Sequence, residues 1–359
     1  MLSVYIHIPF CNHICSYCDF PKLLYNPNYI NNYLDSLEQE IKERYHNELI
    51  DTIYIGGGTP TSLSDEELTK LLNILTIFKT KDSLEYTIES NIESLTLSKI
   101  KILKQYNINR VSLGVQSFNP NTLKYLNRYH TKDQVIEVIN YLKNNNITNI
   151  NIDLIYATNN DINEVKEDLN TFLSLDIPHL SYYSLIIEDN TILKINNTNY
   201  IDEDIEYNMY KLINKTLTNN NYHQYEISNY SKDNYESIHN LNYWHNGNYY
   251  GFGLGSVSYL NNLRRSNTKN LTKYLNHKYL DYEEYEDKTT RMKTDLILAL
   301  RTTKGLNLDN FYHKYHKHLE SVYDIKELLK DNILIIKDNY LSINPKYLYL
   351  ENEIILKII

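Results

Sequence analysis

The amino-acid sequence predicts an α/β fold in which six β/α units close partway into a barrel, followed by a small winged-helix-like C-terminal domain. Up to about residue 185, short runs rich in β-branched residues alternate with longer segments that carry apolar residues at helical spacing. This alternation is typical of a parallel sheet covered by helices. The expected strands are Ser3–His7, Asp51–Ile55, Leu84–Glu89, Arg110–Val115, Asn149–Ile155 and His179–Ser184.

The segments between these strands have apolar residues three or four positions apart, so each can bury one helical face. The expected helices are Asn31–Tyr45, Ser64–Phe78, Leu97–Gln105, Lys132–Lys143 and Ile162–Leu173.

The rest of the chain follows a different pattern. Its expected elements are a loop at 186–200, a helix at Asp202–Thr218, a glycine-punctuated segment up to Ser258, a helix at Lys293–Leu300, and a hairpin of Ile333–Ile336 with Tyr340–Ile343. The helix and hairpin predict the winged-helix-like unit. We therefore expect a core domain at residues 1–261 and a small domain at 286–359, with a linker near 262–285.

Composition excludes several classes of protein. The formal net charge is −9 and the pI is near 5.8, so nothing indicates a nucleic-acid partner. No run of about 18 apolar residues occurs, so no transmembrane segment is expected. Residues 1–10 lack a basic region and small residues before Cys11, a pattern that speaks against a signal peptide. We expect a cytoplasmic protein.

All three cysteines lie within eight residues, Cys11, Cys15 and Cys18. Their odd number and tight spacing argue against disulfides and favour a metal site in a reducing compartment. Three thiolates at C-x3-C-x2-C suit an iron–sulfur cube with one iron free of protein ligands. Zinc is the alternative, and it would need His7 or His13 as a fourth ligand.

Glycines and polar residues stand where the expected strands end. Gly56, Gly57 and Gly58 follow the second strand, where they permit a sharp turn and close approach of a ligand. Glu89 ends the third strand and Gln116 follows the fourth. Since ligands of such barrels lie at the carboxyl ends of the strands, these residues are candidates for a binding site.

The cysteine spacing, with Tyr17 before the third cysteine, resembles the radical S-adenosylmethionine (SAM) family. Tyr5–Phe10 before the cysteines, and Asp51–Ile55 leading into Gly56–Thr61, resemble the oxygen-independent coproporphyrinogen oxidase group, particularly its heme-chaperone (HemW) branch. The resemblance implies a partial barrel with a 4Fe-4S cluster whose open iron takes the amino and carboxylate groups of SAM. It also implies an electron donor for the cluster, because one electron cleaves SAM to a 5′-deoxyadenosyl radical.

The resemblance assigns roles to individual residues. It implies that Cys11, Cys15 and Cys18 ligate the cluster. The positions that match SAM contacts are Tyr5, Tyr17, Gly57, Gly58, Thr59, Glu89, Gln116, Arg128 and Asp153. By its residue type alone, Arg128 would be a solvated helix residue.

A second motif, His239-Asn240-Leu241-Asn242-Tyr243-Trp244, contains the only tryptophan of the chain. Histidine can ligate heme iron and large aromatic residues can pack on a porphyrin, although one of twelve histidines carries little meaning alone. The whole HNxxYW pattern resembles the heme-binding motif of the chaperone branch, which implies that His239 is a heme ligand.

Some positions depart from the family pattern. The oxidase carries a fourth cysteine where this chain has Phe20, and it has a long N-terminal arm before the first cysteine, so we expect no coproporphyrinogen decarboxylation. Ser256-Val257 stand where alanine and histidine are usual, and Ile92 stands where proline is usual. Ala157-Thr158-Asn159 replaces the usual Gly-Leu-Pro.

We therefore expect a heme chaperone that carries a 4Fe-4S cluster and SAM and passes heme to an acceptor protein. The main alternative is an active radical SAM enzyme of the oxidase type that acts on a porphyrin-like or unknown substrate. A third, more distant alternative is a metal-binding protein without SAM chemistry.

Overall fold

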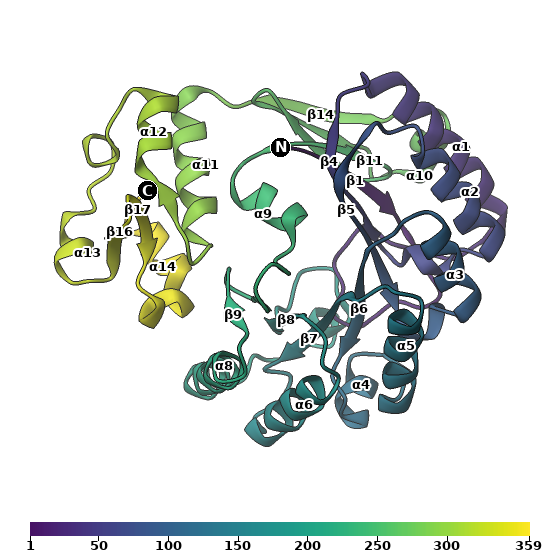
Figure 1. Ribbon diagram of the computed structural model, residues 1–359, viewed down its shortest axis with the longest axis horizontal. Helices are drawn as coiled ribbons and strands as arrows, with labels where there is room; N and C mark the ends of the chain where they lie inside the picture. Colours follow the sequence, from purple (N-terminus) through teal and green to yellow (C-terminus); the bar gives the residue numbers. More distant parts are fainter.

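A twelve-stranded sheet, curved into an open barrel, organises residues 1–285 of a computed structural model that describes residues 1–359 (Figure 1). Its centre is a run of six parallel, neighbouring strands. These are β1 (Leu2–Ile8), β4 (Ile50–Gly57), β5 (Thr80–Asn91), β6 (Arg110–Gln116), β7 (Asn149–Tyr156) and β8 (His179–Ser184). The prediction of a partial barrel with six β/α units is thus confirmed.

Further strands extend the sheet at both edges. One edge continues from β1 through β11 (Asn248–Phe252), β12 (Val257–Leu260), β13 (Leu263–Asn267) and β14 (Leu280–Tyr285), and the other from β8 through β10 (Asn229–Ser231) to β9 (His223–Gln224). The predicted linker near 262–285 is therefore wrong, because this segment pairs its backbone with β12 and contains the helix α10 (Leu271–Leu275). Tyr274 and Tyr279 of this segment are buried in the main core.

Helices cover the convex face of the sheet, as Figure 1 shows. They are α1 (Pro27–Arg44), α2 (Asp65–Leu75), α3 (Leu97–Gln105), α4 (Pro120–Tyr125), α5 (Lys132–Asn144), α6 (Ile162–Ser174) and α8 (Glu203–Thr218). Capping boxes fix the starts of two of them, with Ser64 and Glu67 at α2 and Thr131 and Gln134 at α5. The short helices α4 and α7 (Ile192–Ile195) were not predicted, because a single turn leaves no periodic signal.

Several short elements connect these layers. They are β2 (Phe10–Cys11), β3 (Leu23–Leu24), and the 3₁₀ turns η1 (Pro60–Ser62), η2 (Ile92–Ser94), η3 (Leu319–Ser321) and η4 (Pro345–Leu350). β2 pairs in parallel with β3, and this pairing ties the start of the cysteine loop to the segment that follows it.

The C-terminal unit has its own hydrophobic core, formed by residues between Met292 and Ile358. Its elements are α11 (Lys288–Leu300), β15 (Leu306–Asn307), α12 (Leu308–Tyr315), α13 (Lys326–Lys330), β16 (Leu334–Lys337), β17 (Tyr340–Ile343) and α14 (Glu351–Leu356). A small sheet in the order β15-β17-β16 packs with these helices, as expected for a winged-helix-like unit. The limits 1–261 and 286–359 as independent domains stay a prediction.

The helix α9 (Ile238–Trp244) lies on the concave side of the sheet, between the barrel strands and the C-terminal unit (Figure 1). Glu85 on β5 accepts hydrogen bonds from the backbone N–H groups of Ile238 and His239, at 3.0 and 2.8 Å, and so holds the start of the helix. Asn246 donates to Asp295 of α11 at 2.8 Å. No helix of the structure has the length and apolar character needed to cross a membrane.

Candidate binding site at the carboxyl ends of the strands

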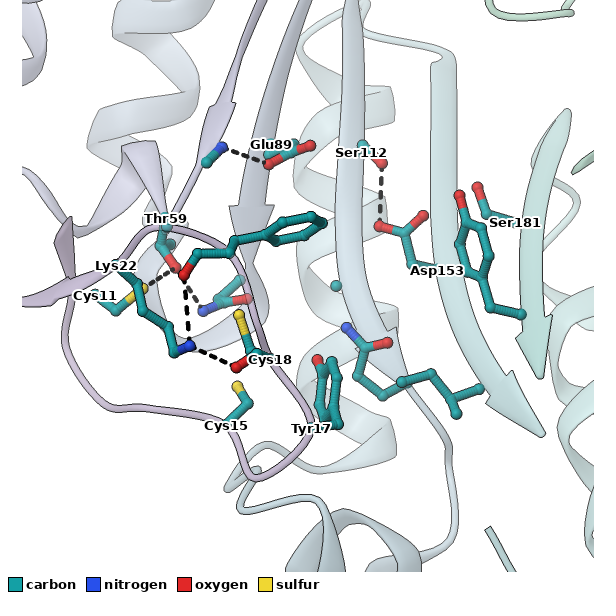
Figure 2. Close-up of a pocket in the computed structure, with 18 of the residues that line it drawn as sticks. Cys11, Cys15, Tyr17, Cys18, Lys22, Thr59, Glu89, Ser112, Asp153 and Ser181 are labelled. Carbon is teal, nitrogen blue, oxygen red and sulfur yellow. Dashed lines mark hydrogen bonds between the residues drawn. The ribbon is translucent and has the colours of Figure 1, made fainter. Parts of the chain in front are cut away.

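A cavity of about 370 Å³ opens at the carboxyl ends of the parallel strands, beneath the cysteine loop. Every predicted site residue except Tyr5 and His239 lines it. Figure 2 shows the three cysteines on the loop at one side, with Glu89, Ser112, Asp153 and Ser181 on successive strands opposite. Side chains on alternate residues of a strand point to the same face, so these neighbouring strands direct their polar residues into one space.

The cysteine loop is held over this cavity by contacts with distant parts of the chain. Ser16 donates its backbone N–H to the Leu126 carbonyl at 3.2 Å and its hydroxyl to the Tyr125 carbonyl at 2.7 Å. Asn127 donates to the carbonyl of Ile14 at 2.6 Å. The loop conformation therefore depends on residues more than a hundred positions away.

The three thiols fit a cluster better than a single ion. All three are free and line the cavity, yet no three His, Cys, Asp or Glu side chains of the structure are grouped to hold one metal ion. In an iron–sulfur cube each iron takes its own thiolate, so the three sulfurs surround the cluster without converging on one point. Zinc needs four ligands that converge on it. Of the two histidines considered as the fourth ligand, His7 has its Nε2 bonded to the Pro21 carbonyl oxygen at 2.8 Å, whereas His13 lines the cavity beside Cys15.

Two polar side chains donate hydrogen bonds to cysteine sulfur atoms. The Thr59 hydroxyl donates to Cys11 Sγ at 3.6 Å, and Arg128 Nη1 donates to Cys15 Sγ at 3.7 Å. Burial raises the pKa of Cys11 to about 11 and also raises the pKa of Cys18. Burial acts in the same direction on Cys15, but a hydrogen bond with His13 and the charge of Arg128 lower its pKa overall. Such outer contacts orient thiolate ligands and tune a bound metal.

The glycine run has a packing role that its sequence did not indicate. A Cβ on Gly58 would lie 2.9 Å from Cys11 Sγ, and one on Gly56 would lie 2.8 Å from Glu89. Gly57 has φ of +119°, and its Cβ would lie 2.7 Å from the His7 ring. Packing and backbone conformation therefore require glycine at Gly57 and Gly58, where the φ angle and the nearby Pro9 and Phe10 backbone leave no room for a side chain, whereas a Cβ at Gly56 would displace the Glu89 carboxyl group.

Two half-buried carboxyl groups face the cavity. Glu89 accepts from the Tyr54 hydroxyl at 2.9 Å and from the Gly57 backbone N–H at 3.0 Å. Burial raises the pKa of Glu89 to about 7 despite these donors. Burial also raises the pKa of Asp153, which accepts from Ser112 at 3.2 Å and Asn151 at 2.8 Å. Both groups retain lone pairs that can accept from hydroxyl or ammonium groups of a ligand.

Gln116 lies at the end of β6 in a left-handed backbone conformation, with φ of +70°. The register of β6 against β7 shifts between Gly114 and Gln116, so the strand ends in an irregularity that turns this side chain into the cavity. Non-glycine residues with positive φ are uncommon and are enriched at functional sites.

Arg128 is buried, in contrast to the solvated position expected from its residue type. It donates to Asn91 Oδ1 at 2.7 Å and to the Gly114 carbonyl at 2.6 Å, and it lies 3.4 Å from Glu93. Asn91 also donates to the Thr59 hydroxyl at 2.9 Å. Asn91 and Glu93 were not predicted as site residues, although the position of Asn91 at the end of β5 follows the same rule that selected Glu89.

Tyr17 packs against the small apolar cluster that contains Leu126, Ile155 and Leu185. Its ring therefore has a fixed place at the edge of the cavity, as Figure 2 shows. Tyr5, by contrast, lines a second cavity of about 460 Å³ together with Tyr243 and Tyr249. The Tyr5 hydroxyl lies 3.0 Å from His7 Nδ1.

His239 is enclosed by protein on all sides. Its Nδ1 lies 2.7 Å from the Thr52 hydroxyl and its Nε2 lies 2.9 Å from the Tyr243 hydroxyl. The ring is 1% exposed and packs against Tyr54, with centroids 5.0 Å apart. Burial and the nearby Arg110 lower its pKa to about 3. Neither nitrogen is free, so this conformation offers no ligand to a heme iron.

The chain is similar to known proteins over most of its length. The family described as "Radical SAM superfamily" matches residues 5–170. The heme chaperone HemW of Lactococcus lactis is 39% identical over 92% of this chain and 90% of that protein, and HemW of Bacillus subtilis is 35% identical over 92% and 91%. HemW of Escherichia coli is 31% identical over 81% of this chain and 80% of that protein.

Among solved structures, coproporphyrinogen III oxidase (HemN) from Escherichia coli superposes with a TM-score of 0.88. The superposed region covers 99% of this chain and 89% of the oxidase chain. The two sequences are 21% identical, so this likeness concerns the fold.

Proposed function

Because this chain belongs to the radical SAM superfamily and, within it, to the family of the heme chaperone HemW, we propose that it binds heme and delivers it to acceptor proteins. The observation that carries the proposal is the similarity to curated heme chaperones, which runs through nearly the whole chain. The partial barrel and its cavity support it, because they provide a place for a 4Fe-4S cluster and SAM.

We propose that Cys11, Cys15 and Cys18 hold the cluster. Their common position at one cavity supports this, as do the donors Thr59 and Arg128 beside two of the sulfurs. A bound cluster would supply the electron needed for SAM chemistry. The protein would orient the thiolates and keep bulk water from them, with Gly58 leaving space beside Cys11.

We propose that SAM occupies the space between the cysteine loop and the strand ends. The carboxyl groups of Glu89 and Asp153 would accept from the ammonium and hydroxyl groups of the ligand, and Gln116 would offer both a donor and an acceptor. Tyr17 would pack beside the adenine. The shared cavity supports this assignment, whereas Tyr5, which faces the second cavity, lacks that support.

The assignment of His239 as heme ligand has one supporting and one opposing feature. Its low pKa keeps the ring neutral at physiological pH, which is the form that binds iron. Its nitrogens are both occupied, so the hydroxyl of Tyr243 must leave Nε2 before ligation. We propose that heme binding includes this local opening of α9.

We further propose a cytoplasmic location and an electron donor protein for the cluster. The free thiols support a reducing compartment, where cysteines persist without disulfides.

Anaerobic heme titration of the protein reconstituted with iron and sulfide tests the proposed function. We expect a Soret band that saturates with heme, followed by transfer of heme to an apoprotein with a distinct heme spectrum. A protein that forms the cluster and binds SAM, but gives no saturable Soret band, would contradict the chaperone proposal and leave a radical SAM enzyme as the better interpretation.

The fold likeness to coproporphyrinogen III oxidase calls for a separate measurement. We expect no conversion of coproporphyrinogen III in the presence of SAM and a reductant, because Phe20 stands where the resemblance places the fourth cysteine of the oxidase. Product formation at a catalytic rate would favour the enzymatic alternative.

A further inference from the structure

Arg110 is a buried cation without a partner. It begins β6, is 2% exposed and lines the cavity. Its guanidinium takes part in no hydrogen bond or ion pair within the protein, and its Nε is a buried donor without an acceptor. An unpaired buried charge is costly, and native proteins almost always satisfy such groups. Arg128, in the same cavity, has four protein partners.

Arg110 lies deeper in the barrel than the predicted SAM residues. In the sheet it stands opposite Thr87 of β5 and Asn149 of β7. Glu89 stands opposite Ser112 and Asp153 opposite Gly114, so with a rise of about 3.3 Å per residue the Cα of Arg110 lies about 7 Å below the level of Glu89 and about 13 Å below that of Asp153. Asn240 of α9 lines the same cavity, and the charge of Arg110 contributes to the low pKa of His239. The guanidinium thus belongs to the floor of the barrel, beside the HNxxYW helix.

The carboxyl groups around this floor bond other partners and none lies in hydrogen-bond contact with Arg110, although the charge of Arg110 acts on Asp153 and lowers its pKa against the effect of burial. Glu85 accepts from the backbone of α9, Glu89 from Tyr54 and Gly57, and Asp153 from Ser112 and Asn151. None of them forms an ion pair with Arg110. The floor therefore presents a fixed positive charge toward the cavity, with its partner to be supplied by a ligand.

We propose that Arg110 binds a carboxylate group of the ligand that enters the barrel. A planar guanidinium matches a carboxylate through two parallel hydrogen bonds, and burial strengthens such a pair. Taking heme as the ligand, which rests on the proposed function, the carboxylate is a propionate of heme, because the resemblance gives the methionine carboxylate of SAM to the open iron of the cluster at the cysteine loop. SAM binding therefore serves as the internal control.

The test uses the full-length protein with its cluster reconstituted, and the variants Arg110→Gln and Arg110→Lys. SAM affinity is measured by calorimetry with SAM and with decarboxylated SAM. Heme affinity is measured by absorbance with heme and with heme dimethyl ester. We expect Arg110→Gln to weaken the binding of heme by roughly ten-fold or more and to leave the binding of heme dimethyl ester and of SAM unaffected. A loss confined to SAM would overturn the proposal.

Stability distinguishes a binding role from a structural one. Since Arg110 has no protein partner, Arg110→Gln without ligand is expected to unfold at the same temperature as the wild type or higher. Lys99→Gln is the matched control, because Lys99 is a buried cation outside the cavity that donates to the carbonyls of Thr61 and Ser94. We expect that variant to unfold at a lower temperature with both affinities unchanged.

Two other results would overturn the proposal. One is Arg110→Gln binding heme as tightly as the wild type, and the other is an equal loss of affinity for heme and for heme dimethyl ester. Should Arg110→Gln fail to fold, Arg110→Lys keeps the charge without the planar pair of donors, and unchanged affinities in that folded variant would count against a carboxylate pair. Absence of heme binding in the wild type itself would refute the proposed function and this proposal with it, whereas a wild type that binds heme and an Arg110→Gln variant that binds it equally well would refute the role of Arg110 alone.

Discussion

The cavity under the cysteine loop and the helix α9 carry the two most specific motifs of the sequence. They differ in whether their polar groups are free to bind a ligand. In the cavity, thiols, carboxyl groups and Arg110 face a common space and keep bonding capacity for a ligand. On α9, both nitrogens of His239 are bonded inside the protein. A motif can therefore match its family equally well where the site is open and where it is closed.

This difference suggests different energetic requirements for the two sites. The cavity is arranged before a ligand arrives, so binding needs little rearrangement. Ligation of iron by His239 must first break a buried hydrogen bond to Tyr243, whose loss reduces the apparent affinity for heme. Variants in both regions test this contrast.

The largest expected effect concerns the cysteines. Replacing Cys11, Cys15 or Cys18 with alanine removes one of the three proposed ligands of the cluster, and bound iron is expected to fall by roughly ten-fold or more. Iron and sulfide analysis after anaerobic reconstitution measures this. Asn12→Ala, an exposed neighbour in the same loop, is the control and should keep its cluster. Unchanged iron in all three cysteine variants would show that the cavity is not the cluster site.

Two enclosed histidines allow a matched test of α9. His179 resembles His239, since its nitrogens bond Asn151 at 2.6 Å and Tyr225 at 2.7 Å. Each histidine-to-alanine change should lower the free energy of unfolding by about 2–3 kcal/mol, because buried partners lose their hydrogen bonds. Only His239→Ala should also abolish or shift the Soret band.

Tyr243→Phe sharpens the same test. It frees Nε2 of His239, so heme affinity should rise if that nitrogen ligates iron. Equal Soret bands for wild type, His239→Ala and Tyr243→Phe would show that the helix has only a structural role.

A pH effect of intermediate size is expected from Glu89. Burial raises its pKa from 4.5 to about 7, so the folded protein holds this proton more tightly than the unfolded chain. The free energy of unfolding contributed by Glu89 therefore decreases as pH rises from 4.5 to about 7, by up to about 3 kcal/mol. Denaturant titrations of wild type and Glu89→Gln at several pH values isolate this contribution, because other titrating groups are common to both proteins.

Glu89 should also make SAM binding depend on pH. A ligand donor prefers the ionised carboxylate, so SAM affinity should fall below pH 7, by at most about ten-fold per unit. Asp168 provides the control: burial raises its pKa to about 7 as well, but it accepts from Ser117 and Phe118 outside the cavity lining. Asp168→Asn should retain the pH dependence of SAM binding, and a flat profile in the wild type would argue against a contact with Glu89.

The smallest expected effect lies at the end of β7. Ala157 has φ of +62° where the family pattern usually has glycine, and an L-residue pays a steric cost there. Ala157→Gly should raise the free energy of unfolding by about 0.5–1 kcal/mol, after the entropic cost of glycine. Ala299→Gly, inside α11, should lower it by about 1 kcal/mol. A loss of stability in both variants would show that Ala157 is not strained.

Local patterns in the sequence determined the central parallel strands, most helices and the three cysteines as one group. They succeeded because strand and helix periodicity arises from neighbouring residues, and because parallel strands bring their carboxyl ends to one edge. The rule that selected Glu89 and Gln116 therefore placed both in the cavity.

Only the tertiary structure decided which distant groups meet. Arg128 is buried because Asn91, Gly114 and Cys15 surround it, and the segment predicted as a linker became strands because β12 offered an unpaired edge. The enclosed state of His239 and the unpartnered charge of Arg110 likewise depend on elements far apart in the chain. Residue type and spacing report what a side chain can bond, whereas burial and partners depend on how the sheet curves and which segments pack inside it.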